Sequence, residues 1–344
     1  MSSRFIDRLL PAPVNGGFRM EGYWVWCGSC IKGEDGRYHL FASRWPRKYP
    51  MHPGWLFHSE VVRAVADRPE GPYEFQEVVL ERRSHHLFDG RATHNPSIHK
   101  CGDTYLLFYI GATYNAEPPG VEDHPTNDDR YYRQVWHNKR IGLATSKSIF
   151  GPWTRSDLPI LEPRPGKWDT TIASNPAPCV KADGSVYLMY KSSAPAPGRV
   201  GPFSLGMAHA PHWTAPFTRL QDGPLFGLGS DDCHVEDPFL WHDGERFNVI
   251  MKDMTGAMCG EHHAGVHMTS PDALNWTPGP SPLAYSRKVL WDDGQVRTMG
   301  SFERPSLLIQ DGVPTHLFSA TADGPGGFMA AGTTWNMVTP LKKP

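Results

Sequence analysis

The chain has 344 residues, of which 39% are hydrophobic and 20% are charged, and its formal net charge is −2. This balance excludes the strongly basic surface with which proteins bind nucleic acids or anionic membranes. The N-terminal sequence MSSRFIDRLLPAP has no apolar core of signal-peptide length, and no window reaches the ~18 apolar residues of a membrane-spanning helix. With Met1 taken as the native start, we expect a cytoplasmic protein.

The predicted elements form one unit that recurs five times along the chain. Each copy opens on a polar tripeptide, at a place where a buried strand would show apolar residues. The five openings are Cys27-Gly28-Ser29, His94-Asn95-Pro96, Ser174-Asn175-Pro176, Glu236-Asp237-Pro238 and Glu303-Arg304-Pro305. Their first residues are 67, 80, 62 and 67 positions apart, close to one fifth of the chain. Repeats of this length indicate a solenoid or a propeller.

Within each copy, a short apolar strand leads through a tight turn into a second strand. The turns are Asp35-Gly36, Gly102-Asp103, Asp183-Gly184, Asp243-Gly244 and Asp311-Gly312. Asp-Gly between apolar runs is a strong hairpin signal, because a type I′ turn needs positive φ at both central residues. The second strands are expected at residues 37–45, 104–112, 185–193, 246–254 and 314–322.

A third strand follows in every copy and a fourth strand in four of the copies. The third strands are expected at 59–67, 140–148, 205–211, 264–271 and 327–335, and the fourth at 71–75, 151–155, 215–219 and 275–278. Four-stranded antiparallel units repeated radially are propeller blades. We therefore predict an all-β fold, a five-bladed β-propeller forming one domain over residues 1–344, with four antiparallel strands per blade. A β-sandwich would leave the five copies unexplained.

The blade geometry also predicts which end of the axial channel is functional. If the first strand of each blade is innermost, the polar openings converge on one mouth of the channel and the tight turns lie at the other. The long loops that enter the first strands, or join the second and third strands, reach the same mouth as the openings. These loops are rich in Trp, Tyr, His, Arg and Asp. Long loops in a compact domain are usually functional, and this composition suits an oligosaccharide cleft.

Several of these features together resemble a known group of enzymes. The blade count, the Asx-Gly hairpins, the Gly-Pro-Trp segment at 151–153 and the acidic openings at Glu236 and Glu303 look like the five-bladed β-propeller glycoside hydrolases. The resemblance spans nearly the whole chain and is to glycoside hydrolase family 43, with relatives in families 32, 62, 68, 117 and 130. It implies a glycosidase active in polysaccharide degradation and carbohydrate metabolism.

The resemblance implies catalytic roles as well. In family 43 an aspartate in blade 1 is the general base, a second aspartate in a middle blade orients the acid, and a glutamate in blade 4 is the general acid. Glu236 matches the glutamate. Cys27 or Gly28 stands where the blade 1 aspartate is expected, and Asn175 stands in place of the middle one. The chain therefore resembles a divergent member that lacks the usual blade 1 aspartate.

Other carboxylates at the mouth are candidates for the missing catalytic group, because glycoside cleavage normally needs two carboxyl groups. We expect Glu303 to be the second carboxylate and Asp237 to orient the acid or to bind a substrate hydroxyl. Crowding of three acids should raise the pKa of at least one of them. The structural alternative is an ion pair, for example with Arg304. Reserve candidates for the base are Asp89, Asp169, Asp231 and Asp232.

Nine residues are predicted to contact the substrate. They are His94, Asn95, Asn175, Arg304, Trp26, Trp55, Asp169, His234 and His263. Structural alternatives exist, because His94 and Asn175 can satisfy neighbouring polar groups and the tryptophans can pack between blades. Arg304 and Lys252 are suited to hold a carboxylate or sulfate, so an acidic or sulfated sugar is a candidate substrate.

The cysteines and histidines lack a metal-binding pattern. The six cysteines are scattered, and Cys27 and Cys30 form a C-x-x-C inside a predicted strand, without a second pair at zinc spacing. A site built from Asp232 with His234, His262 and His263 lacks the usual ligand spacing. We expect neither a metal ion nor a cofactor.

Three functions are compatible with these observations. The first is an exo-acting glycoside hydrolase for a plant or algal oligosaccharide, working by inversion with Glu236 as the acid. The second is a glycoside phosphorylase, which by resemblance to family 130 needs one carboxylic acid and a basic phosphate pocket. The third is a non-catalytic carbohydrate-binding propeller, favoured by Cys27 and Asn175 at the expected acid positions. Fold alone does not decide between them. The sugar, the linkage and the oligomeric state stay open.

Overall fold

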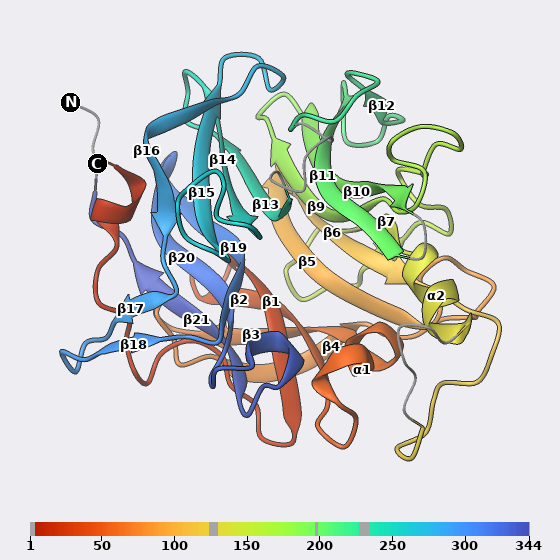
Figure 1. Cartoon of the computed structure of the whole chain (residues 1–344), viewed down its shortest axis with the longest axis horizontal. Helices are drawn as coiled ribbons and strands as arrows, with labels where there is room; N and C mark the ends of the chain where they lie inside the picture. Colours follow the sequence, from red (N-terminus) through yellow and green to blue (C-terminus); the bar gives the residue numbers. More distant parts are fainter. Residues whose placement is uncertain (1–3, 124–129, 197–198, 227–233, 344) are drawn as a thin grey trace.

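The computed structural model describes residues 4–123, 130–196, 199–226 and 234–343. Five small antiparallel sheets stand in a ring, and the first strands of neighbouring sheets contact one another around the axis (Figure 1). Each sheet runs outward from the axis in the order of the sequence. The predicted all-β, five-bladed β-propeller is confirmed, since short closed blades bury their faces against each other.

The first three blades have four strands each. Blade 1 consists of β1 (Tyr23–Lys32), β2 (Tyr38–Pro46), β3 (Glu60–Ala66) and β4 (Glu74–Leu80). Blade 2 consists of β5 (Ala92–Cys101), β6 (Thr104–Ala112), β7 (Arg140–Ser146) and β8 (Thr154–Arg155). Blade 3 consists of β9 (Ser174–Val180), β10 (Val186–Ala196), β11 (Arg199–Ala210) and β12 (Thr218–Arg219).

The last two blades lead up to the point where the N-terminal segment closes the ring. Blade 4 consists of β13 (Val235–His242), β14 (Phe247–Asp253), β15 (Ala264–Ser270) and β16 (Thr277–Tyr285). A hairpin of β17 (Lys288–Leu290) and β18 (Val296–Thr298) leads to blade 5, with β19 (Ser301–Gln310), β20 (Val313–Ala322) and β21 (Thr334–Pro340). Phe18 exchanges two backbone hydrogen bonds with Asn336 on β21, at 2.9 and 3.0 Å. The N-terminal segment thus takes the outermost place in blade 5.

The third strand of blade 5 lies later in the chain than the sequence predicts. Residues 327–335 were expected to form it, but Gly327–Met329 is a short 3-10 turn (η2) and β21 begins at Thr334. Gly327 has φ of 52°, a left-handed conformation that interrupts a strand and that glycine adopts at little cost. The segment therefore bends over the channel mouth before it pairs with β20.

Two short helices lie in the loops between second and third strands. The helix α1 (Met51–His58) belongs to blade 1 and α2 (Arg130–His137) to blade 2, and each has eight residues. The two helices contact each other on one side of the ring (Figure 1). A 3-10 turn, η1 (Phe5–Arg8), packs near β16. No helix in the described ranges is long and apolar enough to cross a membrane.

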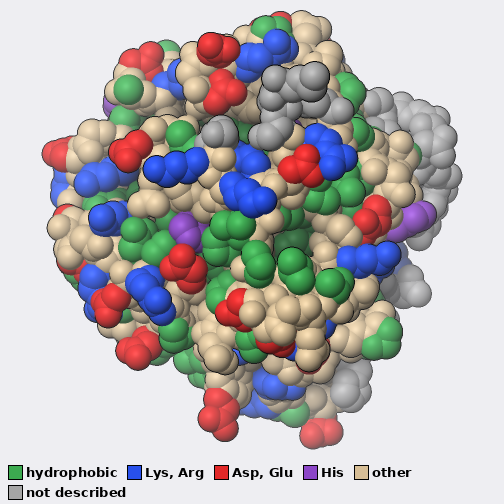
Figure 2. Space-filling view, turned by 90° about the vertical axis from the view of Figure 1, so that its left-hand side faces the viewer, with side chains coloured by type: hydrophobic (Ala, Val, Ile, Leu, Met, Phe, Trp, Pro, Cys, Tyr) green, Lys and Arg blue, Asp and Glu red, His purple; other side chains and the backbone are tan. Residues whose placement is uncertain are grey.

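The apolar core lies between neighbouring blades. Phe41 of blade 1 packs with Leu107 of blade 2, and Met189 of blade 3 packs with Val249 of blade 4; all four are fully buried. On the outside, Lys and Arg side chains alternate with Asp and Glu over the face that carries β16, β17 and β18 (Figure 2). This mixture agrees with the near-zero net charge.

A left-handed residue interrupts the innermost strand of every blade at the same place. Cys27, Asn95, Asn175, Asp237 and Arg304 have φ between 49° and 58°, and the strand register shifts at each one. Such a bulge leaves a residue unpaired and turns side chains toward the axis. Proline follows four of the five residues, which suits a position without a ladder hydrogen bond. In blade 1 the equivalent tripeptide is Trp26-Cys27-Gly28, one residue earlier than its sequence spacing predicts.

Candidate functional site

A cavity of about 460 Å³ opens at the channel mouth where the five polar openings lie. Its walls come from α1, α2, the inner strands of blades 3 to 5, and the segment around η2. Aromatic rings cover one part of the wall, namely Trp55, Tyr132, Trp136, Phe203 and Phe328. Charged side chains cover another part, namely Lys139, Lys191, Lys252, Arg287, Arg304, Glu236 and Glu303. The predicted loops between second and third strands therefore do border a cavity, as does the loop that enters blade 5, whereas the loops that enter blades 2 and 3 do not line it.

Three carboxylates meet at this mouth. Glu236 and Asp237 belong to β13 and Glu303 belongs to β19, and one oxygen of each lies within 4.8 Å of the other two. Glu236 and Glu303 line the cavity. The Asp237 side chain is fully buried and lines the narrow channel below, which has a volume of only about 30 Å³. Only the two glutamates are placed to meet a ligand directly.

Two lysines connect these glutamates across blade boundaries. Lys191 of blade 3 lies with its Nζ 2.8 Å from Oε2 of Glu236 in blade 4. Lys252 of blade 4 lies with its Nζ 2.7 Å from Oε1 of Glu303 in blade 5, and 3.5 Å from Oε1 of Glu236. Ser301 donates a further hydrogen bond to Oε1 of Glu303 at 3.0 Å. Each lysine thus bridges to the glutamate of the next blade.

The cations decide the ionisation of Glu236. Burial alone would raise the pKa of this carboxyl, but Lys191, Lys252 and Arg304 hold it well below its usual value. Burial likewise tends to lower the pKa of Lys252, yet Glu303 and Glu236 raise it above its usual value. Glu236 is therefore ionised at neutral pH, and this does not favour the role of proton donor that the sequence resemblance implied.

Asp237 is the carboxyl whose pKa is raised. Burial and the neighbouring Glu236 carboxylate raise it to about 6, although Arg304 opposes them. Nη1 of Arg304 lies 2.6 Å from Oδ1 of Asp237, and Asn175 donates a hydrogen bond to the same oxygen at 2.5 Å. The inner channel thus contains a compact Asn–Asp–Arg cluster drawn from blades 3, 4 and 5. Asp237 fits the expectation that crowding of three acids raises the pKa of at least one of them.

Two other predicted residues, His94 and Trp26, lie beneath the cavity wall. His94 is 3% exposed, and its ring nitrogens contact Ser59 Oγ at 2.8 Å and Cys27 Sγ at 3.4 Å. Burial lowers the pKa of His94 well below its usual value, so the ring is neutral. Trp26 is fully buried against Phe328, with ring centroids 5.5 Å apart. Phe328, rather than Trp26, faces the cavity.

The remaining predicted contacts divide between the cavity and its surroundings. Trp55, Asn175, Arg304 and His263 line the cavity. Asn95 lines only the narrow inner channel. His234 lies against the ring of Phe203, at a centroid distance of 4.9 Å, and is not a lining residue. Asp231 and Asp232 lie outside the described residues.

Asp169 and Asp89 connect strands within a single blade, blade 3 and blade 2 respectively, instead of facing the channel. Asp169 is fully buried and binds Arg164 at 2.9 Å, Arg219 at 2.6 Å and the hydroxyl of Tyr190 at 2.9 Å. Asp89 occupies the equivalent place in blade 2 and has the same kinds of partner, two arginines and a tyrosine. Neither lines the cavity. Their position just before a first strand reflects this repeated structural cluster.

Sequence reasoning missed Lys139, Lys191 and Arg287, and it left Trp136 undecided between blade packing and contact with a sugar. One signal was available for Lys191, because it follows the apolar run VYLMY of β10 and stands opposite Ser174. Lys252 follows a similar run in β14 and stands opposite Glu236. A lysine inside an apolar strand, at the same place in two repeats, indicates a buried ion pair. Lys139 and Trp136 carried no such signal, because they lie in a long loop and helix.

The carboxylate cluster does not fit a metal site. Glu236, Asp237 and Glu303 are close enough to share a cation. However, each of the three carboxylates already has an oxygen in contact with a cation, which is Lys191, Lys252 or Arg304. Their positive charges would repel a metal ion, so we assign none to this cluster.

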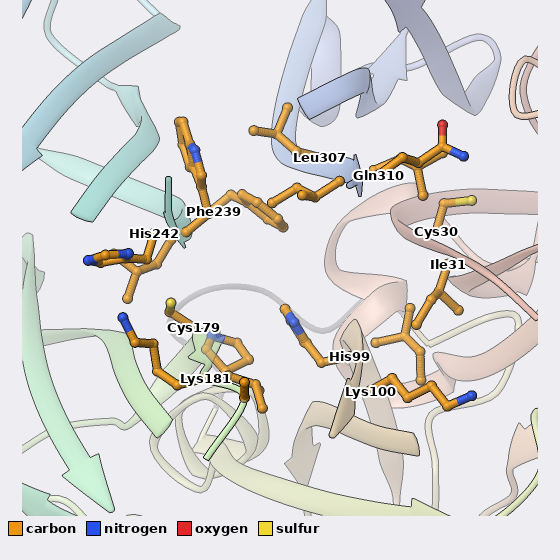
Figure 3. A pocket seen from close by; sticks show the side chains of 18 of the residues that line it. Cys30, Ile31, His99, Lys100, Cys179, Lys181, Phe239, His242, Leu307 and Gln310 are labelled. Atoms are coloured by element: carbon orange, nitrogen blue, oxygen red, sulfur yellow. The ribbon is translucent and has the colours of Figure 1, made fainter. Parts of the chain in front are cut away.

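A second cavity of about 750 Å³ lies at the opposite mouth. Figure 3 shows its wall, with His99, Cys179, Phe239 and Leu307 around the opening. Asp311 is the only carboxylate among the described residues that line it, and the wall is otherwise mainly apolar or basic. This cavity is larger than the first, but it lacks the paired carboxylates that glycoside chemistry requires. We therefore place the candidate site at the other mouth.

Comparison with known proteins supports the architecture. No protein-family model matches the chain, and no curated protein matches it either. Solved structures do match over almost its whole length. One, a complex of BT0996 with RGII, has a TM-score of 0.70 with 14% identity, covering 99% of this chain and 94% of that protein. Zg3597, a family 117 glycoside hydrolase from the marine bacterium Zobellia galactanivorans, has a TM-score of 0.65 with 13% identity, covering 97% and 89%.

A thermostable family 43 glycoside hydrolase also matches, with a TM-score of 0.61 and 13% identity, covering 97% of this chain and 92% of that one. These identities are too low to transfer an activity, and fold alone does not establish function. The comparisons show that the chain has the five-bladed β-propeller fold that these glycoside hydrolases share.

Proposed function

We propose that the chain is a glycoside hydrolase whose reacting carboxylates are Glu236 and Glu303. The observation that carries this proposal is the pair of glutamates lining one aromatic cavity, with oxygens within 4.8 Å of each other. Aromatic rings such as Trp55 and Trp136 can cover the apolar faces of a sugar while the carboxylates act on its anomeric carbon. The likeness of the fold to that of glycoside hydrolases is further support for this chemistry.

The separation of the glutamates supports retention of configuration. Retaining glycosidases have carboxyl groups about 5–5.5 Å apart, and inverting enzymes about 6.5–9.5 Å, which leaves room for a water molecule. Oxygens of Glu236 and Glu303 that lie within 4.8 Å of each other leave little room for such a water molecule, which does not favour inversion. Glu236 is kept ionised by Lys191 and Lys252. An ionised carboxylate is suited to attack the anomeric carbon.

In this mechanism Glu303 is the acid and base. It contacts one lysine where Glu236 contacts two, and both of its short contacts are to Oε1. Glu303 protonates the leaving oxygen while Glu236 forms a bond to the anomeric carbon and the glycosidic bond breaks. A water molecule, deprotonated by Glu303, then attacks the anomeric carbon and releases Glu236. Asp237, which accepts a hydrogen bond from Asn175, holds Arg304 beneath the pair.

The test uses aryl glycosides and plant or algal oligosaccharides as substrates. Glu303→Gln should lower kcat about 10²–10⁴-fold. Glu236→Gly should abolish cleavage, and added azide should restore turnover and yield a glycosyl azide, because azide replaces the missing nucleophile. The exposed Glu162→Gln is the matched control and should keep full activity. Full activity of Glu236→Gly, or saturable sugar binding with no turnover over the panel, would reject the proposal; the latter would indicate a binding propeller.

A phosphorylase is the second candidate, because five cations line the cavity. Such an enzyme transfers the sugar from its leaving group to phosphate, and a basic pocket would hold the phosphate next to the anomeric carbon. Turnover that requires inorganic phosphate and produces a sugar phosphate would select this function. Hydrolysis at the same rate without phosphate would exclude it.

A further inference from the structure

Lys139 is a buried lysine at the cavity, with no counter-ion among the residues that the structure describes. It lies two residues after the end of α2 and directly before β7, is 1% exposed and lines the cavity. No hydrogen bond or ion pair joins its Nζ to any residue in the described part of the chain. The nearest groups are indole rings, with Nζ 3.2 Å from the ring centroid of Trp136 and 5.4 Å from that of Trp55. A buried ammonium is costly unless it is paired, so this position needs a partner or a function.

The surrounding charges do not supply that partner. Lys191 and Arg304 are the neighbouring cations, and Glu236 and Asp237 are the neighbouring anions. Both anions are already engaged, Glu236 by Lys191 and Asp237 by Arg304. Two histidines, the buried His94 and the exposed His137, also lie near enough to feel the charge of Lys139, and their own pKa values are lowered.

The cavity as a whole has the same imbalance. Lys139, Lys191, Lys252, Arg287 and Arg304 line it, against only two carboxylates among the residues that the structure describes. Arg287 donates to the backbone oxygen of Gly300 at 3.3 Å and has no carboxylate partner for its guanidinium among the described residues. The cavity therefore carries an excess of positive charge, and the unpaired amine of Lys139 lies next to the aromatic wall, where a sugar ring would lie.

We propose that Lys139 marks a subsite for an oxyanion carried by the ligand, and that this oxyanion is the carboxylate of an acidic sugar. The subsite rests on the proposed function in one respect, namely that the ligand is a saccharide. The indole faces of Trp55 and Trp136 flank the same amine, so a single ligand can place its ring on the aromatic wall and its carboxylate on Lys139. Inorganic phosphate offers the same oxyanion chemistry and is a separate arm of the test.

Binding at this subsite should be coupled to proton uptake. Burial lowers the pKa of Lys139 well below its usual value, and Lys191 and Arg304 lower it further, while Glu236 and Asp237 oppose them. A bound oxyanion stabilises the ammonium and raises that pKa again. The complex therefore takes up a proton when the free amine is neutral, and affinity falls as the pH rises above the pKa of the free protein.

The experiment is titration calorimetry on the full chain, with probes that differ only at C6: D-galacturonate against D-galactose, and D-glucuronate against D-glucose. Triethanolamine and Tris are suitable buffers, because they carry no oxyanion and differ clearly in ionisation enthalpy. We expect a uronate to bind about tenfold or more tightly than its neutral partner and to take up as much as about one proton. Inorganic phosphate alone is titrated in the same way.

Lys139→Met keeps the length of the side chain and removes its charge, so it should bind the uronate and the neutral sugar equally and take up no proton. Lys139→Arg keeps the charge and should keep the preference for the uronate, without proton uptake. Lys147→Met removes an exposed lysine at the blade periphery and should behave as wild type. Because Lys139→Met removes a buried charge, its thermal midpoint should not fall, which separates loss of binding from misfolding.

The outcomes distinguish this inference from the proposed function. Phosphate that binds with Lys139-dependent proton uptake supports the subsite and changes its ligand to phosphate. The subsite is overturned if the wild-type protein binds uronates and phosphate no more tightly than Lys139→Met does and takes up no proton. That conclusion would hold even if the wild type cleaves neutral glycosides. Uronate binding with proton uptake but without cleavage of any glycoside supports the subsite and rejects the hydrolase.

Discussion

Lys191 and Lys252 help to keep the Glu236 carboxylate ionised. Both lysines are buried, and both lie in the second strand of a blade, opposite the polar opening. Buried charges are costly to desolvate, and their mutual attraction repays that cost only when the pairing is complete. The site is therefore a network in which removing one charged side chain leaves its partners buried without a counter-charge.

This network gives the stability of the protein a defined pH dependence through Glu236. The pKa of Glu236 in the folded protein lies well below the 4.5 of a free glutamate. Its stabilising contribution is present above about pH 4.5 and is lost as the pH falls below that value, because the unfolded chain binds the proton more readily. Glu236→Gln should lower the free energy of unfolding by about 3–5 kcal/mol at pH 7 and by much less at pH 3.

Urea unfolding at several pH values measures this difference. Glu162→Gln is the control, because Glu162 pairs with Arg140 at the exposed periphery and should contribute less than about 1 kcal/mol at any pH. A loss of stability in Glu236→Gln that does not change with pH would show that the lysines do not hold Glu236 ionised.

The sequence indicated some of the residues at the cavity and could not indicate others. Glu236, Glu303 and Arg304 stood out because polar groups at the start of an apolar strand need an explanation. His94 belonged to the same pattern, yet it lies below the wall, where the rings of Trp45 and Trp55 pack against it. Lys139 depends on the path of a long loop, and no local pattern determines that path.

At the scale of secondary-structure elements, the loops before β5 and β9 each carry an aspartate that connects several strands. Asp169 joins Arg164 in its own loop to Tyr190 of β10 and Arg219 of β12. Asp89 makes the corresponding contacts in blade 2. An acidic residue just before a strand is compatible with a catalytic role and with a structural role. The sequence could therefore mark these aspartates only as candidate bases. Burial and partners, which come from the tertiary fold, separate the two.

Asp169→Asn should therefore affect stability and not ligand binding. Removing the charge leaves Arg164 and Arg219 without their buried partner, which should lower the free energy of unfolding by about 3–5 kcal/mol. Asp222→Asn is the matched control, since Asp222 also pairs with Arg164 but is exposed, and it should cost less than about 1 kcal/mol. Chemical denaturation and sugar titration measure the two effects. Weakened sugar binding with an unchanged free energy of unfolding would instead show that Asp169 belongs to the substrate site.

At the scale of the whole molecule, the ring is closed by a segment that does not belong to the repeat. Phe18 pairs with Asn336 of β21 and packs between blades 5 and 1, where it is 1% exposed. The repeat period was sufficient to predict five blades. It could not predict the closure, because residues before Tyr23 share no pattern with the copies. It could not predict the late start of β21 either, because the glycines that precede β21 hide where the strand begins.

Phe18→Ala should lower the free energy of unfolding by about 3–5 kcal/mol, because it opens a cavity at the junction of the first and last blades. Thermal and chemical unfolding measure this loss. The half-exposed Phe150 lies on the rim of the ring, and Phe150→Ala should have a much smaller effect. Equal effects of the two substitutions would mean that the closure contributes no more than an ordinary surface contact.

The five left-handed bulges have a consequence for how such a protein changes over time. One backbone path accommodates a cysteine, two asparagines, an aspartate and an arginine at equivalent places around the axis. The side chain at each of these places can therefore be exchanged without a change in the backbone path. A single substitution at one of them alters the charge or the hydrogen bonding around the axis, so different polar arrangements are reachable in small steps on a fold that stays constant.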